Sequence, residues 1–148
     1  MKKNFEVTRI LPYKHTLVFE QIADFERYEQ YLPFCNRSRS LDTDNIDFSQ
    51  IGELEFDIAG VSYKIKSGNV IKDERILITQ IKGPFKEMRA SWDVEQFDDG
   101  SSKISFKVYA EVSYFLGILL SDSTVEKFVN IFLDSFTNDL AARNKKDN

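Results

Sequence analysis

The chain has 148 residues, of which 42 % are hydrophobic and 30 % charged, so its length and composition predict one soluble globular domain over residues 1–148. Its formal net charge of −4 argues against broad binding to nucleic-acid phosphates, and DNA is not expected as a partner. One cysteine and one histidine exclude an internal disulfide and most zinc and histidine-based catalytic sites. The N-terminus has no apolar secretory stretch, and no segment approaches the ~20 apolar residues of a membrane span, so a cytoplasmic location is expected.

The first part of the chain predicts one strand followed by two short helices. Residues 5–11 alternate in hydrophobicity, and Pro12 ends this strand. Apolar side chains at helical spacing then predict a helix over residues 15–25 and a second one over residues 26–32. Pro33 ends the second helix and favours an extended bend.

The middle of the chain shows the clearest β pattern, in which apolar and charged residues alternate between turn sequences. The predicted strands span residues 36–41, 46–58, 61–66, 76–82, 88–94 and 104–112. The predicted turns and bends lie at residues 42–45, 59–60, 72–75, 83–84 and 98–101. Short turns make neighbouring strands antiparallel. Together with the first strand, the pattern predicts a curved sheet of about seven antiparallel strands with one apolar face.

The C-terminal region predicts a long helix around which the rest of the fold is organised. Over residues 123–145 apolar side chains recur at steps of three and four, and three phenylalanines lie four residues apart on this face. Ser123 and Glu126 fit a capping box at its start. The apolar faces of the sheet and of this helix must meet. We therefore predict an α+β helix-grip fold, in which the sheet curls around the helix.

A short apolar segment, residues 114–120, precedes the long helix. Its spacing predicts that the final helical region begins near Tyr114 and bends at residues 121–122. The segment is far too short to cross a bilayer. One interpretation is a helical turn that covers the core. The other is a mobile gate whose Leu119 and Leu120 contact a membrane surface, such as the inner membrane, while a lipid passes.

The pattern leaves two interpretations of the interior open. Small residues, Ala90 and Ala110, alternate with large rings on the predicted inner face. They either interdigitate into a solid core or leave a ligand cavity, for which volumes of roughly 300–1,000 Å³ are typical. No catalytic constellation is predicted. The acidic residues of the 46–58 strand belong to its solvent face, His15 lies at a helix start, and Cys35 is interpreted as a packing residue.

Two motifs resemble a known family. Residues 27–35 read R-Y-E-Q-Y-L-P-F-C, which is similar to the Y-x-x-F-L-P-x-C signature of the coenzyme Q-binding, START-like proteins, although Tyr31 stands where phenylalanine is usual. Residues 83–86 and Trp92 resemble the family's G-P-F-K…W segment. The resemblance implies a helix-grip with a hydrophobic tunnel. Eukaryotic members bind ubiquinone and support respiration, bacterial members are called ribosome-association toxins, and more distant relatives are called polyketide cyclases.

Three functions follow from the resemblance. The first is a non-enzymatic binding protein for a polyprenyl quinone of ubiquinone or menaquinone type, with no required cofactor and with peripheral membrane contact. The second is a toxin that binds the large ribosomal subunit and inhibits translation, which the acidic net charge weakens. The third is an aromatic polyketide cyclase, for which no acid or base can be named.

The quinone hypothesis predicts a set of cavity residues. They are Leu32, Pro33, Phe34, Phe56, Tyr63, Met88, Trp92, Phe106, Val108, Phe128, Phe132 and Phe136. The phenylalanines of the long helix, with Phe56, Phe106 and Val108, would contact the isoprenoid tail. Trp92 and Tyr63 would lie near the head group, and residues 32–34 would form the mouth. No metal site and no catalytic residue are predicted.

Overall fold

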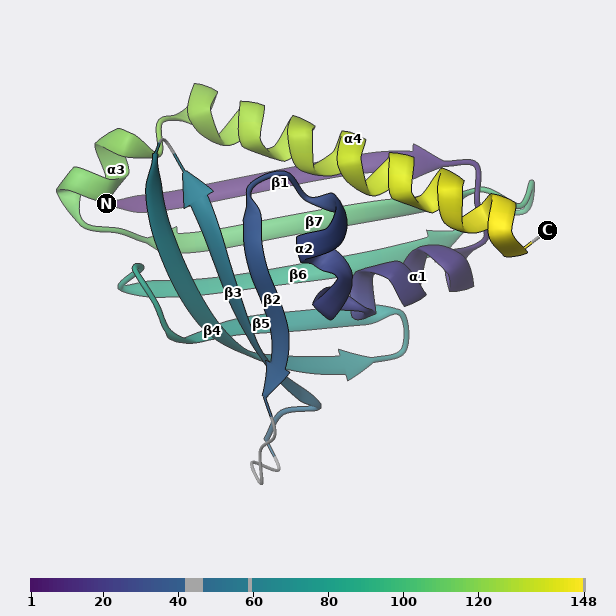
Figure 1. The fold of residues 1–148 in the computed structure, drawn as a ribbon, viewed down its shortest axis with the longest axis horizontal. Coiled ribbons are helices and arrows are strands. Elements are labelled where there is room, and N and C mark those ends of the chain that lie inside the picture. Colours follow the sequence, from purple (N-terminus) through teal and green to yellow (C-terminus); the bar gives the residue numbers. More distant parts are fainter. Residues whose placement is uncertain (42–46, 59, 148) are drawn as a thin grey trace.

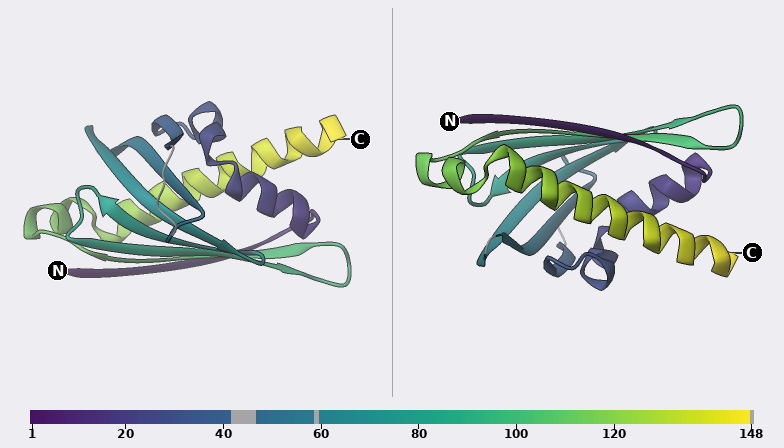
Figure 2. Two further views of the ribbon diagram at one scale, coloured as in Figure 1. Left: turned by 90° about the horizontal axis from the view of Figure 1, so that it is seen from below. Right: turned by 90° about the horizontal axis from the view of Figure 1, so that it is seen from above.

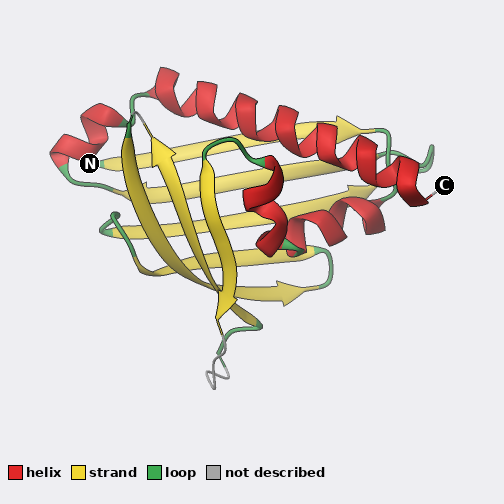
Figure 3. Ribbon diagram, viewed as in Figure 1, coloured by secondary structure: helices red, strands yellow, loops and turns green. Residues whose placement is uncertain are grey.

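The structure of the protein is a computed structural model, which describes residues 1–41, 47–58 and 60–147. Its elements are β1 (Lys2–Leu11), α1 (His15–Ala23), the 3₁₀ helix η1 (Phe25–Arg27), α2 (Tyr28–Tyr31), β2 (Cys35–Leu41), β3 (Gln50–Ile58), β4 (Val61–Lys72), β5 (Arg75–Lys82), β6 (Glu87–Gln96), β7 (Ser102–Glu111), α3 (Tyr114–Leu119) and α4 (Asp122–Asp147). The predicted fold class, an α+β helix-grip, is confirmed (Figure 3).

The sheet in the described part of the chain has seven strands in the order β1-β7-β6-β5-β4-β3-β2, with antiparallel neighbours throughout. The starts of β1 and β3 differ most from the prediction. β1 begins at Lys2 and pairs with β7 over its whole length. β3 begins at Gln50, because Asp47 lies in a turn and Ser49 in a bend, and the Ser49 hydroxyl accepts a hydrogen bond from the Ile71 N–H of β4. The predicted turn over residues 42–45 lies outside the described residues.

The short helices after β1 are present but are divided differently from the prediction. α1 ends at Ala23 because the backbone of Asp24, with φ −84° and ψ 62°, leaves the helical region. The predicted second helix is split into η1 and α2. Leu32 ends α2 in an extended conformation, as expected of a residue that precedes proline.

The sheet is strongly curved, and this curvature creates the concave face. β4 is 12 residues long, and its pairing with β5 shifts register between Lys66 and Ser67. The extra residue of this bulge, Ile81, lies on β5, and such a bulge bends the sheet locally and increases its twist. Figure 1 shows β2, β3 and the first part of β4 crossing the direction of β1, β7 and β6. Both views in Figure 2 place α1, α2 and α4 on the same side of the sheet.

α4 is the central helix of the fold, and its buried face packs on the sheet. Leu133, Phe136 and Leu140 are at most 1 % exposed and pack in the main core with residues of β1, α1, β6 and β7. The predicted break before this helix is confirmed, because α3 ends at Leu119 and α4 begins at Asp122. The predicted capping box at Ser123 is wrong. The Ser121 hydroxyl accepts the Thr124 N–H at 3.3 Å and so caps the helix instead.

The C-terminal half of α4 is joined to the helices after β1 by polar contacts. The Gln21 side-chain amide donates a buried hydrogen bond of 2.9 Å to the Phe136 carbonyl. Arg27 pairs with Asp139 at 3.4 Å, and Arg143 pairs with Asp24 at 3.0 Å. These contacts hold this half of α4 against α1 and η1, while its N-terminal half spans the concave face of the sheet.

Candidate functional cavity

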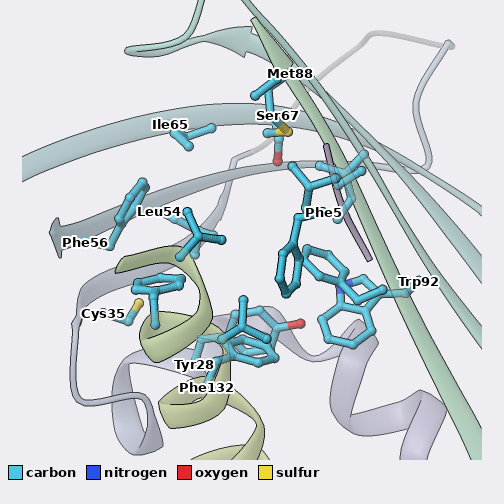
Figure 4. A pocket seen from close by; sticks show the side chains of 18 of the residues that line it. Phe5, Tyr28, Cys35, Leu54, Phe56, Ile65, Ser67, Met88, Trp92 and Phe132 are labelled. Atoms are coloured by element: carbon cyan, nitrogen blue, oxygen red, sulfur yellow. The ribbon is translucent and has the colours of Figure 1, made fainter. Parts of the chain in front are cut away.

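A cavity of about 320 Å³ lies between the concave face of the sheet and α4 (Figure 4). Its size falls within the range of small-molecule sites. Its wall is mostly apolar and takes residues from the strands, from the helices before β2 and from α4. Of the two interpretations that the sequence left open, the cavity is confirmed and the solid core is wrong.

Most of the residues predicted for the site lie in this wall. The cavity is lined by Leu32, Phe34, Phe56, Met88, Trp92, Phe106, Val108, Phe128 and Phe132 from the predicted set. Their contact with a ligand stays a prediction. Leu32 is only 4 % exposed, so it belongs to the wall, and the expectation that it forms an open mouth is not met.

Three predicted residues lie outside the wall. Phe136 has the same helical spacing as the other two rings, but the turn of α4 that carries it is covered by α1, and its ring packs against Trp92 and Phe132 in the core. The ring centroids of Tyr63 and Phe56 are 6.0 Å apart, and Tyr63 does not line the cavity. Pro33 is exposed to solvent. The prediction that these three line the cavity is wrong.

Aromatic rings from separate elements pack against one another, mostly in tilted pairs, in the wall around α4. The Phe128 and Phe34 ring centroids are 4.0 Å apart, and Phe132 lies 5.6 Å from Trp92. Trp92 in turn lies 4.4 Å from Phe106, its ladder partner on β7. Aromatic pairs at these distances add to the stability that burial provides. The rings therefore form an apolar surface that is already ordered before a ligand binds.

Sequence reasoning missed several residues of the wall. The aromatic side chains of Phe5, Phe25 and Tyr28 line the cavity, and Figure 4 shows Phe5 and Tyr28 among the side chains of its wall. Polar side chains also line it, among them Gln50, Ser67 and Asn69 of the β3–β4 hairpin. The alternation that identified the inner face of β4 continues beyond residue 66 to Ser67 and Asn69. A longer strand prediction would therefore have found them.

Two titratable groups in the wall are kept neutral by burial. Desolvation raises the pKa of Tyr28 well above its usual value, and its hydroxyl donates a hydrogen bond of 2.5 Å to the Ile22 carbonyl. Burial also raises the pKa of the Cys35 thiol, whose sulfur donates to the Arg37 carbonyl at 3.5 Å. A thiol with a raised pKa is a poor nucleophile, which agrees with a packing role for Cys35.

Outside the cavity, the histidine and an acidic residue of β3 that were weighed as catalytic candidates form ion pairs with neighbouring side chains. The His15 side chain pairs with Glu74, and the His15 backbone N–H donates to the Gln96 side-chain carbonyl at 2.9 Å. Glu53 accepts a hydrogen bond of 2.6 Å from Arg39, which lowers the pKa of that carboxyl. The described residues contain no cluster of three histidine, cysteine, aspartate or glutamate side chains that could hold a metal ion.

Comparison with proteins of known sequence finds relatives that are named as toxins and one that is named as a coenzyme Q-binding protein. The ribosome association toxin RatA of Rickettsia prowazekii is 27 % identical over 134 residues, which cover 87 % of this chain and 84 % of the relative. The mitochondrial coenzyme Q-binding protein coq10 of Schizosaccharomyces pombe is 21 % identical over 138 residues, which cover 84 % of each chain.

Comparison with solved structures supports the fold. The Zhui aromatase/cyclase from Streptomyces sp. R1128 has a TM-score of 0.81 at 17 % identity, covering 97 % of this chain and 96 % of that one. A START superfamily protein from Mycobacterium smegmatis has a TM-score of 0.75 at 16 % identity, covering 98 % and 99 %. The family model described as polyketide cyclase / dehydrase and lipid transport matches residues 11–137. The chain therefore belongs to the polyketide cyclase / dehydrase and lipid transport family.

Proposed function

We propose that this protein binds a long hydrophobic molecule, a polyprenyl quinone of ubiquinone or menaquinone type, in the cavity between the sheet and α4. The cavity of about 320 Å³ is the observation that carries the proposal. Its aromatic wall suits an isoprenoid chain, because transfer of apolar surface from water contributes roughly 25 cal/mol per Å². The family description includes lipid transport, and one relative is named for coenzyme Q binding.

The binding role is proposed without a catalytic step. The described wall of the cavity contains no aspartate, glutamate or histidine. Its tyrosine and cysteine have raised pKa values, so they are unsuited to act as general bases near neutral pH. The likeness to an aromatase/cyclase shows a shared fold at 17 % identity. A fold of this kind does not determine the reaction.

We also propose that the ligand is exchanged at a membrane surface, through α3. Tyr114, Phe115 and Ile118 expose 75 %, 76 % and 60 % of their surface. They replace Leu119 and Leu120 as the candidate contact residues, since Leu120 is buried in the cavity wall. No helix among the described residues is long and apolar enough to cross a membrane, so contact would be peripheral.

The ligand can be sought directly. The purified protein is extracted with organic solvent, and the extract is analysed by mass spectrometry for quinones and other long-chain lipids. The delipidated protein is then titrated with decylubiquinone while the fluorescence of Trp92, the only tryptophan of the chain, is recorded. We expect a quinone in the extract and saturable quenching, because Trp92 lies in the wall. An extract without quinone, together with no saturable quenching, would refute the proposal.

A second candidate function is association with the large ribosomal subunit. The toxin of Rickettsia prowazekii is similar over most of both chains, and its name describes ribosome association. Sedimentation of the protein with purified large subunits through a sucrose gradient tests this role. Migration with the subunit supports it, and a protein that stays at the top of the gradient removes it. The two functions are separable, because a quinone titration needs no ribosome.

A further inference from the structure

The inner face of the β3–β4 hairpin has a group of polar side chains that we call the β3–β4 polar cluster, formed by Gln50, Ser67 and Asn69. The Ser67 hydroxyl donates to the Asn69 side-chain carbonyl at 3.2 Å. The Asn69 amide donates to the Gln50 side-chain carbonyl at 3.3 Å. All three residues line the cavity, and Ser67 and Asn69 are only 9 % and 8 % exposed.

Packing alone does not explain this cluster. Asparagine and serine have low β propensity, and a buried polar group costs free energy unless its hydrogen bonds are satisfied. Ser67 also follows the register shift between β4 and β5, whose extra residue, Ile81, lies on β5. Bulges are over-represented beside functional sites.

There is space for a ligand group beside the cluster. Asn69 lies opposite Ile78 on β5, and Ile78 lies opposite Ala90 on β6, whose side chain is small. Gly52, opposite Ser67, packs directly beneath the ring of Phe25. The ring closes this side of the cavity, so a group held by the cluster would be shielded from water. Figure 4 shows Ser67 on the cavity wall, across from Tyr28 and Phe132.

We propose that the β3–β4 polar cluster binds the polar head of the ligand through a neutral carbonyl or hydroxyl oxygen, an inference that rests on the proposed function. The Asn69 amide carries two N–H groups, and among the described residues it donates to Gln50. Its second N–H can donate to a quinone oxygen, while the Ser67 hydroxyl, which donates to the Asn69 side-chain carbonyl, holds the amide in this orientation. The tail then follows the aromatic wall toward the other end of β3. This placement replaces the expectation that Tyr63 and Trp92 lie near the head group.

The charges around the cavity select neutral heads over anionic ones. Lys3 is the only basic residue in the described wall. It lies on β1, which is separated from β4 by β7, β6 and β5 in the sheet. A carboxylate or phosphate at the cluster would therefore be buried without a nearby cation, which is strongly unfavourable. A quinone carbonyl meets the same donors without that cost, so a fatty acid should bind more weakly than a quinone.

The test compares ligands that differ in the head and share the tail. Decylubiquinone has the carbonyl oxygens, and decylbenzene has the same alkyl chain without them. Binding of both is measured by isothermal titration calorimetry for the wild type, Asn69→Leu and Ser67→Ala. Asn4→Leu, on the exposed face of β1, is the matched control. Circular dichroism confirms that each variant is folded.

We expect Asn69→Leu to weaken decylubiquinone binding about 10-fold, the effect of losing one buried hydrogen bond, and to leave decylbenzene binding unchanged. Ser67→Ala should act in the same direction, and Asn4→Leu should change neither. Unchanged decylubiquinone binding by both cluster variants overturns the inference but leaves the proposed function standing. An equal loss for both ligands also overturns it, since the cluster would then only shape the cavity. A wild type that binds neither ligand overturns the proposed function as well.

Discussion

At the scale of single residues, buried hydrogen bonds hold the helices that close the cavity. The Tyr28 hydroxyl donates to the Ile22 carbonyl and so joins α2 to the end of α1. We expect Tyr28→Phe to lower the free energy of unfolding by about 1–3 kcal/mol, because the buried carbonyl loses its partner. Tyr114→Phe, at a side chain that is 75 % exposed, is the control and should have no measurable effect. Equal stabilities of the two variants in urea denaturation would contradict this role.

The buried tyrosines also make stability depend on pH. Desolvation raises the pKa of Tyr28 and Tyr31 above the value of about 10 found in unfolded chains. Below that pH the tyrosines are protonated in both the folded and the unfolded protein, so they do not make the stability depend on pH. Above it the unfolded state ionises first and is favoured. The free energy of unfolding should fall by up to ~1.4 kcal/mol per pH unit for each tyrosine. Denaturation between pH 9 and 11 should give a shallower slope for Tyr28→Phe, and an identical slope would disprove the assignment.

At the scale of elements, the start of α4 depends on a residue outside the predicted helix. Ser121 caps it by accepting the Thr124 N–H, whereas Ser123 lies within the first turn. We expect Ser121→Ala to cost about 0.5–2 kcal/mol of stability. Ser123→Ala, the same substitution two residues away on the surface, should stay within about 0.5 kcal/mol of the wild type. Thermal unfolding of the two variants checks the assignment. A larger loss of stability for Ser123→Ala would show that Ser123, not Ser121, caps the helix.

The exposed face of α3 has a testable consequence of its own. The double variant Phe115→Ser and Ile118→Ser should reduce flotation with liposomes several-fold, because it removes most of the apolar area available for insertion. Ile131→Ser, at an exposed position on α4 outside this face, is the control and should float like the wild type. Flotation that is unchanged in the double variant would show that α3 is not the contact surface.

At the scale of the whole molecule, the cavity couples ligand binding to stability. A ligand that binds only the folded state adds about 2.7 kcal/mol at a concentration of 100 times its dissociation constant. Saturating decylubiquinone should therefore raise the Tm of the wild type. Ala90→Phe places a ring in the cavity and should abolish the increase.

The control for this variant uses the neighbouring position on the same strand. Ser91→Phe adds the same ring on the opposite face of β6, because successive side chains of a strand alternate. It should keep the ligand-dependent increase in Tm. If both variants respond to the ligand like the wild type, the cavity beside Ala90 is not the binding site.

Periodicity made much of the fold predictable, because it reports how each segment divides its residues between core and solvent. Alternation located the inner residues of β6 and β7, including Trp92 and Phe106, which do face one another. The helical spacing of α4 located Phe128 and Phe132 in the cavity wall. Phe136 was wrongly predicted to line the cavity. It has the same helical spacing as Phe128 and Phe132, and only the packing of α1 over its turn of α4 separates it from the cavity.

The sequence by itself determined the order of elements, the apolar face of the sheet and the apolar face of the final helix, because these depend on residues close together in the chain. The tertiary structure alone decided that the space between the two faces stays open and that the β3–β4 polar cluster enters it. Both depend on the register shift between β4 and β5 and on where α4 is held by Gln21 and Arg27. These are distances between segments far apart in sequence, and no local pattern encodes them.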